Sequence, residues 1–258
     1  MSQNANNINT LFQDAHNSGD LSKDALNILN TIDLGPNIGD ALGEDIGNVP
    51  STECILVSVE LDDSSSIQFA GNTQNVRDGH NLLIDTLKGA KVKDNIQVHA
   101  RKLNGGILYP YSFLDNVPQL DNRNYVPSGG TPLHDETIIL LGTVLAKIQQ
   151  ARDAGISQRT ITIIITDGGD TGHTDRSAEV AVLVKEILRT ETNIIFGMGI
   201  DDGNTDFNAV FSSMGIPLTH VLTPKSDPKE IRKAFQTMSQ SASASASGAN
   251  FNAGGFGS

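Results

Sequence analysis

Three short runs of apolar, mostly β-branched residues constrain the fold of this chain more than any other feature. They cover residues 54–61 (CILVSVEL), 160–166 (TITIIIT) and 193–200 (NIIFGMGI). Because these runs are apolar almost throughout, they are typical of strands that are covered on both faces of a parallel sheet. Such a sheet needs helices on both sides, so the sequence predicts a doubly wound α/β domain.

Helical periodicity fills the chain between these runs, as the α/β interpretation requires. The predicted helices span 75–87, 132–151 and 175–188, with shorter ones after Asp206 and Ser226. Residues 96–103 and 107–113 flank Asn104-Gly105-Gly106, which suits a hairpin turn because Asn and Gly tolerate positive φ. The hairpin predicts one antiparallel strand at an edge of an otherwise parallel sheet.

The two ends of the chain differ in composition from its middle. Residues 1–50 hold seven Asp and Glu against one Lys, a charge of −6 and half of the chain's net −12, and apolar residues at helical spacing there predict helices that dock outside the main domain. After Met238 the chain contains Ser, Ala, Gly, Asn, one Gln and two Phe without any charge, a composition that does not fold alone. We therefore predict an acidic helical extension (1–50), a main domain (51–238) and a low-complexity tail (239–258).

The charge and the cysteine content restrict the partners and the compartment. A net charge of −12 repels phosphate backbones and anionic lipid headgroups, so nucleic acid and membrane surfaces are poor partners. The single cysteine, Cys54, cannot form an internal disulfide, and the sequence has neither a signal-peptide pattern nor a run of 18 apolar residues. We expect a cytoplasmic protein without a membrane span.

Three oxygen-rich segments occur where ligands bind in open α/β sheets. Residues 62–66 (DDSSS) and 166–170 (TDGGD) follow predicted strands, and 128–133 (SGGTPL) precede the longest predicted helix. Ligands in such folds bind beyond the carboxyl ends of the strands. We therefore expect these three segments, called the crest below, to meet at one edge of the sheet.

The crest contains the donors of a site for a small hard cation. In an extended segment Asp62, Ser64 and Ser66 point the same way, and Thr131 and Asp167 add oxygens from the other two segments. Mg²⁺ prefers such oxygen ligands and keeps some waters. If both aspartates bind directly they neutralise the ion; if one binds through water, the ion keeps positive charge and an open position for another protein's carboxylate. Thr131-Pro132 by itself predicts a helix N-cap followed by Pro at the first helical position.

The same residues resemble the metal-ion-dependent adhesion site of von Willebrand factor type A domains, and the resemblance covers roughly residues 51–238. The motif residues are Asp62-x-Ser64-x-Ser66, Thr131 in Gly-Gly-Thr-Pro-Leu and Asp167 in Thr-Asp-Gly. The resemblance implies Mg²⁺ or Mn²⁺ on these five residues, bridging to a partner's acidic side chain. It also implies that bacterial cytoplasmic members pair with an AAA+ ATPase of the MoxR kind. Ser65 and Ile67 depart from the commonest form of the motif, which has Gly and Met there.

The leading hypothesis is thus a non-enzymatic adaptor that binds a protein partner through a metal ion, with no catalytic residues. A second hypothesis is a self-assembling subunit, in which the N-terminal helices and the tail build a homo-oligomer around an internal metal site. A metal-dependent hydrolase is a third. The sequence has no H-E-x-x-H, no Walker phosphate loop and no G-x-S-x-G elbow, and Ser64 stands where a haloacid dehalogenase phosphatase needs its second Asp.

Overall fold

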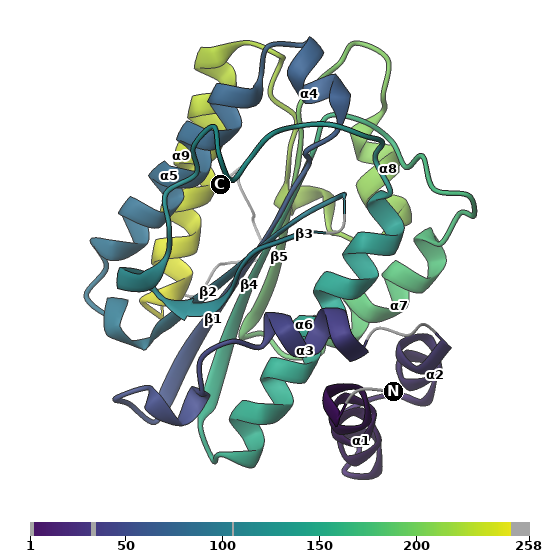
Figure 1. Cartoon of the computed structure of the whole chain (residues 1–258), viewed down its shortest axis with the longest axis vertical. Helices are drawn as coiled ribbons and strands as arrows, with labels where there is room; N and C mark the ends of the chain where they lie inside the picture. Colours follow the sequence, from purple (N-terminus) through teal and green to yellow (C-terminus); the bar gives the residue numbers. More distant parts are fainter. Residues whose placement is uncertain (1–2, 32–34, 105, 249–258) are drawn as a thin grey trace.

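A six-stranded sheet with helices on both faces forms the centre of the molecule (Figure 1). The computed structural model describes residues 3–31, 35–104 and 106–248. The strands lie in the order β3-β2-β1-β4-β5-β6, and every neighbouring pair is parallel except β2–β3. Their bounds are β1 Glu53–Leu61, β2 Ile96–Lys102, β3 Gly106–Phe113, β4 Ser157–Thr166, β5 Asn193–Gly199 and β6 Val221–Leu222. The predicted fold class is confirmed, with the antiparallel strand at an edge.

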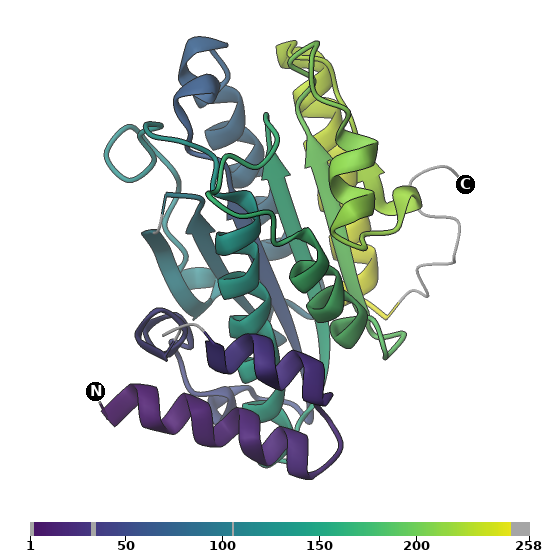
Figure 2. The same ribbon diagram turned by 90° about the vertical axis from the view of Figure 1, so that its right-hand side faces the viewer.

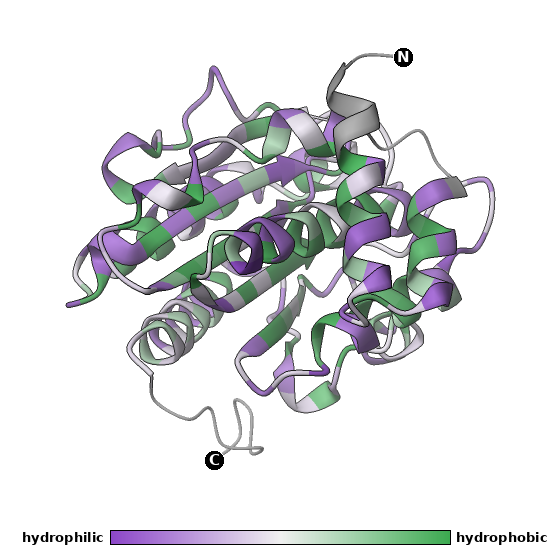
Figure 3. Cartoon of the chain, turned by 90° about the horizontal axis from the view of Figure 1, so that it is seen from below, coloured by the Kyte–Doolittle hydropathy of each residue, from purple (hydrophilic) through white to green (hydrophobic). Residues whose placement is uncertain are grey.

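Two layers of helices cover the sheet. On one face, α5 (Thr73–Lys88) and α9 (Pro228–Ala246) pack on the apolar side of β1, which carries Ile55, Val57, Val59 and Leu61. The other face is covered by α6 (Leu133–Asp153), α7 (Ser177–Ile187) and α8 (Phe207–Ser213) (Figure 2). The outer helices mix hydrophobic and hydrophilic residues, as amphipathic helices do (Figure 3).

Three N-terminal helices add a further layer outside α6 and α7. They are α1 (Gln3–Asn17), α2 (Lys23–Thr31) and α3 (Gly35–Ala41). Phe12, Leu29 and Ile38 are almost completely buried and belong to the same apolar cluster as α6. Gly142 of α6 lets this layer approach closely, because a Cβ there would lie 3.0 Å from both Leu29 and Ile38. The acidic segment is therefore anchored by apolar side chains.

Helix α9 continues beyond Met238, where the composition becomes low in complexity. Ser239, Ala242 and Ala246 are buried, and the last two belong to the core cluster on the α5 side of the sheet. These small residues recur at helical spacing, so the helix packs closely without long side chains. The rest of the predicted tail, residues 249–258, lies outside the described residues. None of the described helices is long and apolar enough to cross a membrane.

The face of the sheet below α6 is more polar than the sequence runs suggest. Alternate residues of β1 and β2 place Ser58, Glu60, His99 and Arg101 on this face, all buried. Glu60 accepts a hydrogen bond from Thr137 of α6 (2.7 Å). The prediction that the strands are covered on both faces is confirmed, but the face below α6 carries these polar side chains beside apolar ones such as Leu56 and Ile164.

Buried histidines should make the fold sensitive to acid. His80 of α5 is fully buried with Nε2 2.7 Å from the Tyr109 hydroxyl, and burial lowers its pKa to about 4. In the unfolded chain the His80 side chain has a pKa near 6.5, so it is protonated more readily there than in the folded protein. The contribution of His80 to the free energy of unfolding is therefore highest above pH 6.5 and decreases as the pH falls toward 4. For His80→Gln, the loss in unfolding free energy between pH 7.5 and 5 should be smaller than in wild type by about 2 kcal/mol.

Urea unfolding at both pH values measures this difference. His173→Gln is the matched control, because the His173 side chain is exposed. Equal pH dependence in wild type and His80→Gln would show that His80 is protonated in the folded state.

Candidate metal centre at the crest

The pairing of β1 with β4 brings two aspartates of the crest, Asp62 and Asp167, together. Asp62 follows β1 and Asp167 follows β4. The strands stay in register to their ends, and the Asp62 amide donates to the carbonyl of Ile165 (3.0 Å). The Asp167 amide in turn donates to Asp62 Oδ2 (3.2 Å). The predicted meeting of these two residues at the carboxyl end of the sheet is thus present in the structure.

The carboxylate of Asp62 is completely buried and strongly hydrogen-bonded. Besides the Asp167 amide, it accepts hydrogen bonds from the Ser64 amide at Oδ1 (2.7 Å) and from the Thr166 hydroxyl at Oδ2 (2.8 Å). A carboxylate has about four acceptor positions, so about one is left. Asp62 is therefore fixed in place, with little capacity for another direct contact.

The oxygens of Ser64, Ser66 and Asp167 form a compact group. Ser64 Oγ lies 2.8 Å from Ser66 Oγ and 3.4 Å from Asp167 Oδ1, and the Ser66 hydroxyl donates to the same Oδ1 (2.6 Å). Adjacent oxygens around an octahedral Mg²⁺ are about 2.9 Å apart, given Mg–O distances of about 2.0–2.1 Å. The three oxygens therefore already have the mutual spacing of ligands to one small cation.

The local backbone of the serine triplet differs from the extended segment that we predicted. Ser64 is extended (φ −69°, ψ 163°), but a short helix, α4 (Ser65–Phe69), begins directly after it. Ser66 thus reaches the site from the first turn of a helix and not by strand alternation. Burial of Ile67 explains the change, because the helix turns this side chain into the core below the crest.

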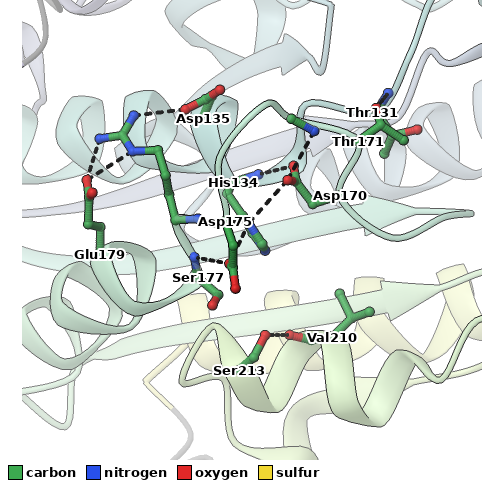
Figure 4. Close-up of polar contacts among 12 residues, drawn as sticks. Thr131, His134, Asp135, Asp170, Thr171, Asp175, Ser177, Glu179, Val210 and Ser213 are labelled. Carbon is green, nitrogen blue, oxygen red and sulfur yellow. Dashed lines mark hydrogen bonds and ion pairs between the residues drawn. The ribbon is translucent and has the colours of Figure 1, made fainter.

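Thr131 is held at the crest by the segment that follows Asp167. Its amide donates to the Thr171 hydroxyl (2.8 Å) and its carbonyl accepts from the Thr171 amide (2.8 Å) (Figure 4). Its Oγ1 lies 3.8 Å from the position of a Cβ on Gly168, next to Asp167. The crest thus includes all five predicted residues: Asp62, Ser64, Ser66, Thr131 and Asp167.

The predicted N-cap role of Thr131 is wrong. Helix α6 begins at Leu133 with Pro132 as its N-cap residue, so Pro132 is not at the first helical position. Asp170 takes over the capping, because its Oδ1 accepts from the His134 amide (3.1 Å) (Figure 4). No hydrogen bond in the described part of the chain involves Thr131 Oγ1, so this oxygen keeps its lone pairs for another partner.

Neither Asp62 nor Asp167 forms an ion pair within the described residues. Lys102 lies 3.6 Å from Asp63 Oδ2 instead. Burial, with a further contribution from the nearby Asp62 charge, raises the pKa of Asp167 to about 6, although its hydrogen bond from Ser66 opposes this shift. Two buried carboxylates without a basic partner are costly, and a bound cation removes that cost.

Sequence analysis missed several residues that hold the crest together. The Tyr125 hydroxyl donates to the Asp62 carbonyl, and Thr166 supplies the hydroxyl described above. Asp63 is buried and accepts from the amide and side chain of Asn104 (2.9 and 2.8 Å), so it neither faces solvent nor belongs to the candidate site. Asp63 and Thr166 adjoin the motif residues, but no sequence signal pointed to Tyr125.

The donor set fits a hard divalent cation. It consists of carboxylate and hydroxyl oxygens, without thiolate or imidazole, and Mg²⁺ and Mn²⁺ prefer such ligands. Among the described residues there is no group of three or more His, Cys, Asp and Glu that could hold a metal ion. The candidate site differs from such groups because three of its five residues contribute hydroxyls.

Comparisons with known proteins find similar folds but no similar sequences. No protein-family profile and no curated protein matches the chain. Among solved structures, the pilus adhesin SpaC from Lactobacillus rhamnosus GG matches with a TM-score of 0.55 at 12% identity, over 75% of this chain and 31% of SpaC. The von Willebrand factor type A protein from Catenulispora acidiphila matches with a TM-score of 0.49 at 16% identity, over 74% of this chain and 43% of that protein.

The sheet has the antiparallel edge strand that the hairpin predicts, and the match to SpaC is a likeness of fold. This chain has a von Willebrand factor type A-like fold. A further match is proximal thread matrix protein 1 from the mussel byssus, with a zinc-occupied adhesion-site motif (TM-score 0.49, 17% identity, 74% of this chain). The matched region makes up only 46% of that mussel protein, so the chain spans less than half of its length.

The hydrogen bond from Thr166 to Asp62 should be a main stabiliser of the crest of this type A-like domain. Thr166→Val keeps the shape but removes a buried donor to a carboxylate, so it should lower the free energy of unfolding by about 1–3 kcal/mol. Thr162→Val is a matched control on the same strand, because Thr162 Oγ1 is buried and has no hydrogen-bond partner among the residues that the structure describes. Its replacement should be neutral or stabilising.

Urea unfolding without added metal measures both variants. Equal stability of the two would mean that the Asp62 carboxylate does not depend on the Thr166 hydroxyl.

Proposed function

We propose that this protein is a non-enzymatic, metal-dependent protein-interaction module. In this proposal a Mg²⁺ ion, or Mn²⁺, is held by Asp62, Ser64, Ser66, Thr131 and Asp167. The observation that carries it is the pair of buried carboxylates, Asp62 and Asp167, that have no ion pair within the described residues, with the hydroxyls of Ser64 and Ser66 against Asp167. Proteins rarely bury two neighbouring carboxylates without an opposite charge, because removing each charge from water is costly.

The hydrogen bonds indicate how the five residues share the ion. Asp62 already accepts three hydrogen bonds, so it contributes through a water molecule and fixes the surrounding loops. Asp167 and the hydroxyls are then the direct ligands. With a single direct carboxylate, the bound ion supplies a net positive charge at the surface of the crest.

That residual charge favours an acidic partner. A carboxylate of another protein completes the coordination and neutralises the ion, while the chain's net charge of −12 otherwise repels acidic molecules. The resemblance implies a MoxR-type AAA+ ATPase in the cytoplasm as one partner of this kind, for which the protein would be an adaptor. Co-purification from cell extract in Mg²⁺ and in EDTA tests this identity.

Metal binding should depend on Asp167 and not simply on negative charge near the crest. Asp167→Asn should reduce Mg²⁺ affinity at least tenfold in calorimetric titration, because it removes the one direct carboxylate. The same variant should be as stable as wild type or more stable in EDTA, since a neutral amide replaces a buried charge that has no basic partner.

Asp202→Asn is the matched control, because Asp202 is exposed near the crest and is not a proposed ligand. It should change Mg²⁺ affinity less than about threefold, as expected for a screened surface charge. No heat of binding to the wild type from either Mg²⁺ or Mn²⁺ would contradict the proposal.

Thr131 offers a separate test, because its hydroxyl has no hydrogen bond among the described residues. Thr131→Ala should weaken Mg²⁺ binding and leave the thermal midpoint in EDTA unchanged, whereas Thr131→Ser should bind as wild type. If Thr131→Ala binds Mg²⁺ with the wild-type affinity, Thr131 is not a ligand.

A further inference from the structure

Exposed apolar side chains are rare in this molecule and concentrate beside the crest. Within the described residues only three large hydrophobic side chains are exposed: Phe69 (84%), Val126 (55%) and Leu218 (52%). Phe69 ends the helix that begins in the serine triplet, and Val126 follows Tyr125, whose hydroxyl binds the Asp62 carbonyl. Isolated exposed apolar residues are common, but apolar groups beside a polar binding site are typical of interaction surfaces.

The phenyl ring of Phe69 is held outward by its helix. Ile67 of α4 is completely buried. The Ser65 amide donates to the Gly129 carbonyl (3.1 Å), and the Gly129 amide donates to the Ser65 hydroxyl (3.1 Å). Ser66 and Phe69 are three residues apart on this helix, so they share a face with their Cβ atoms about 5–6 Å apart. The most exposed aromatic ring of the described chain therefore lies one helical turn from a proposed metal ligand.

Val126 belongs to a segment that is also fixed. Arg77 of α5 donates from Nε and Nη2 to the Tyr125 carbonyl (3.1 and 2.6 Å), and the Ser128 amide donates to the Asp63 carbonyl (2.6 Å). Val126 lies between these two anchored residues. The exposed Val126 side chain is therefore carried by a backbone segment that hydrogen bonds hold in place beside the crest.

The charges around the crest restrict what can cover these side chains. Asp62 and Asp167 repel an acidic segment until a cation is bound, whereas a basic segment would be attracted without any metal. Lys102 lies near the crest, but its ammonium group pairs with Asp63 and not with Asp62 or Asp167. Binding through a metal ion selects an acidic segment. The exposed side chains of Phe69 and Val126 favour a segment that also carries a bulky apolar side chain.

We propose that the partner of this site is a peptide segment in which the metal-binding Asp or Glu has a large apolar residue within about two positions, which packs on Phe69 and Val126. Residues two apart in an extended segment are about 7 Å apart, which matches the helical spacing of Ser66 and Phe69. This inference rests on the proposed function and adds the specificity of the partner. Burial of the phenyl ring should contribute about tenfold to hundredfold in affinity.

A random 12-residue peptide library displayed on phage tests the proposal. Full-length protein in Mg²⁺ is the bait, and bound phage are eluted first with salt and then with EDTA. The EDTA fraction should be enriched in Asp or Glu with Phe, Leu, Ile, Trp or Met within two positions. Selection on Phe69→Ser should keep the acidic residue and lose the apolar one, and Val126→Ser should weaken the apolar preference.

Leu218→Ala is the matched control, because Leu218 is similarly exposed but precedes β6, toward the amino ends of the strands, whereas the crest lies at their carboxyl ends. It should leave the selected sequences unchanged. Selected peptides should bind Phe69→Ser about tenfold or more weakly in fluorescence anisotropy, with unchanged Mg²⁺ affinity. Acidic peptides without an apolar neighbour, or an apolar preference that persists in Phe69→Ser, would overturn this inference alone. An EDTA fraction without acidic enrichment would overturn the proposed function and this inference with it.

Discussion

The pairing of β1 with β4 is the constraint on which the candidate site depends. The two strands run parallel and in register from Glu53↔Ser157 to Leu61↔Ile165, so their chains leave the sheet side by side. The bonds from Thr166 and Asp167 to the Asp62 carboxylate extend this pairing one step beyond the last backbone pair. A one-residue slip would reverse the faces of all β1 side chains and separate the two aspartates. The same pairing thus builds the core and places the carboxylates.

The crest buries the carboxylates of Asp62 and Asp167, which is unusual in a protein interior. Asp62 is fully buried and Asp167 nearly so, and the available lysine is engaged by Asp63. Hydrogen bonds from two amides and a hydroxyl compensate Asp62, whereas in the described part of the chain the Asp167 carboxylate accepts hydrogen bonds from serine hydroxyls only. Serine oxygens can also bind cations. The hydroxyls of Ser64 and Ser66 could therefore give up their hydrogen bonds to Asp167 and bind a metal ion without a change in the backbone conformation.

The sequence predicts the sheet well because its strand signals are local and strong. The last residues of the runs 54–61, 160–166 and 193–200 lie within one residue of the carboxyl ends of β1, β4 and β5. The motif residues that follow the first two runs therefore lie at the same edge of the sheet. The details of the crest depend on tertiary contacts instead. Helix α4 forms because Ile67 is buried, and Asp170 displaces Thr131 as the cap of α6; neither contact is visible in a local pattern. Tyr125 reaches Asp62 across 63 positions, for the same reason.

Because the crest offers few charged ligands, the binding of a metal ion and the binding of a partner would each strengthen the other. If Asp167 is the one direct carboxylate, the site has less charge than a high-affinity divalent site, which gathers several carboxylates. A partner's carboxylate then adds a ligand that the chain itself lacks. By thermodynamic linkage, the factor by which metal strengthens partner binding equals the factor by which partner strengthens metal binding. In the proposed function, such a sparse donor set would favour reversible binding of metal and partner together, and the proposed contact with Phe69 would add affinity that does not depend on the ion.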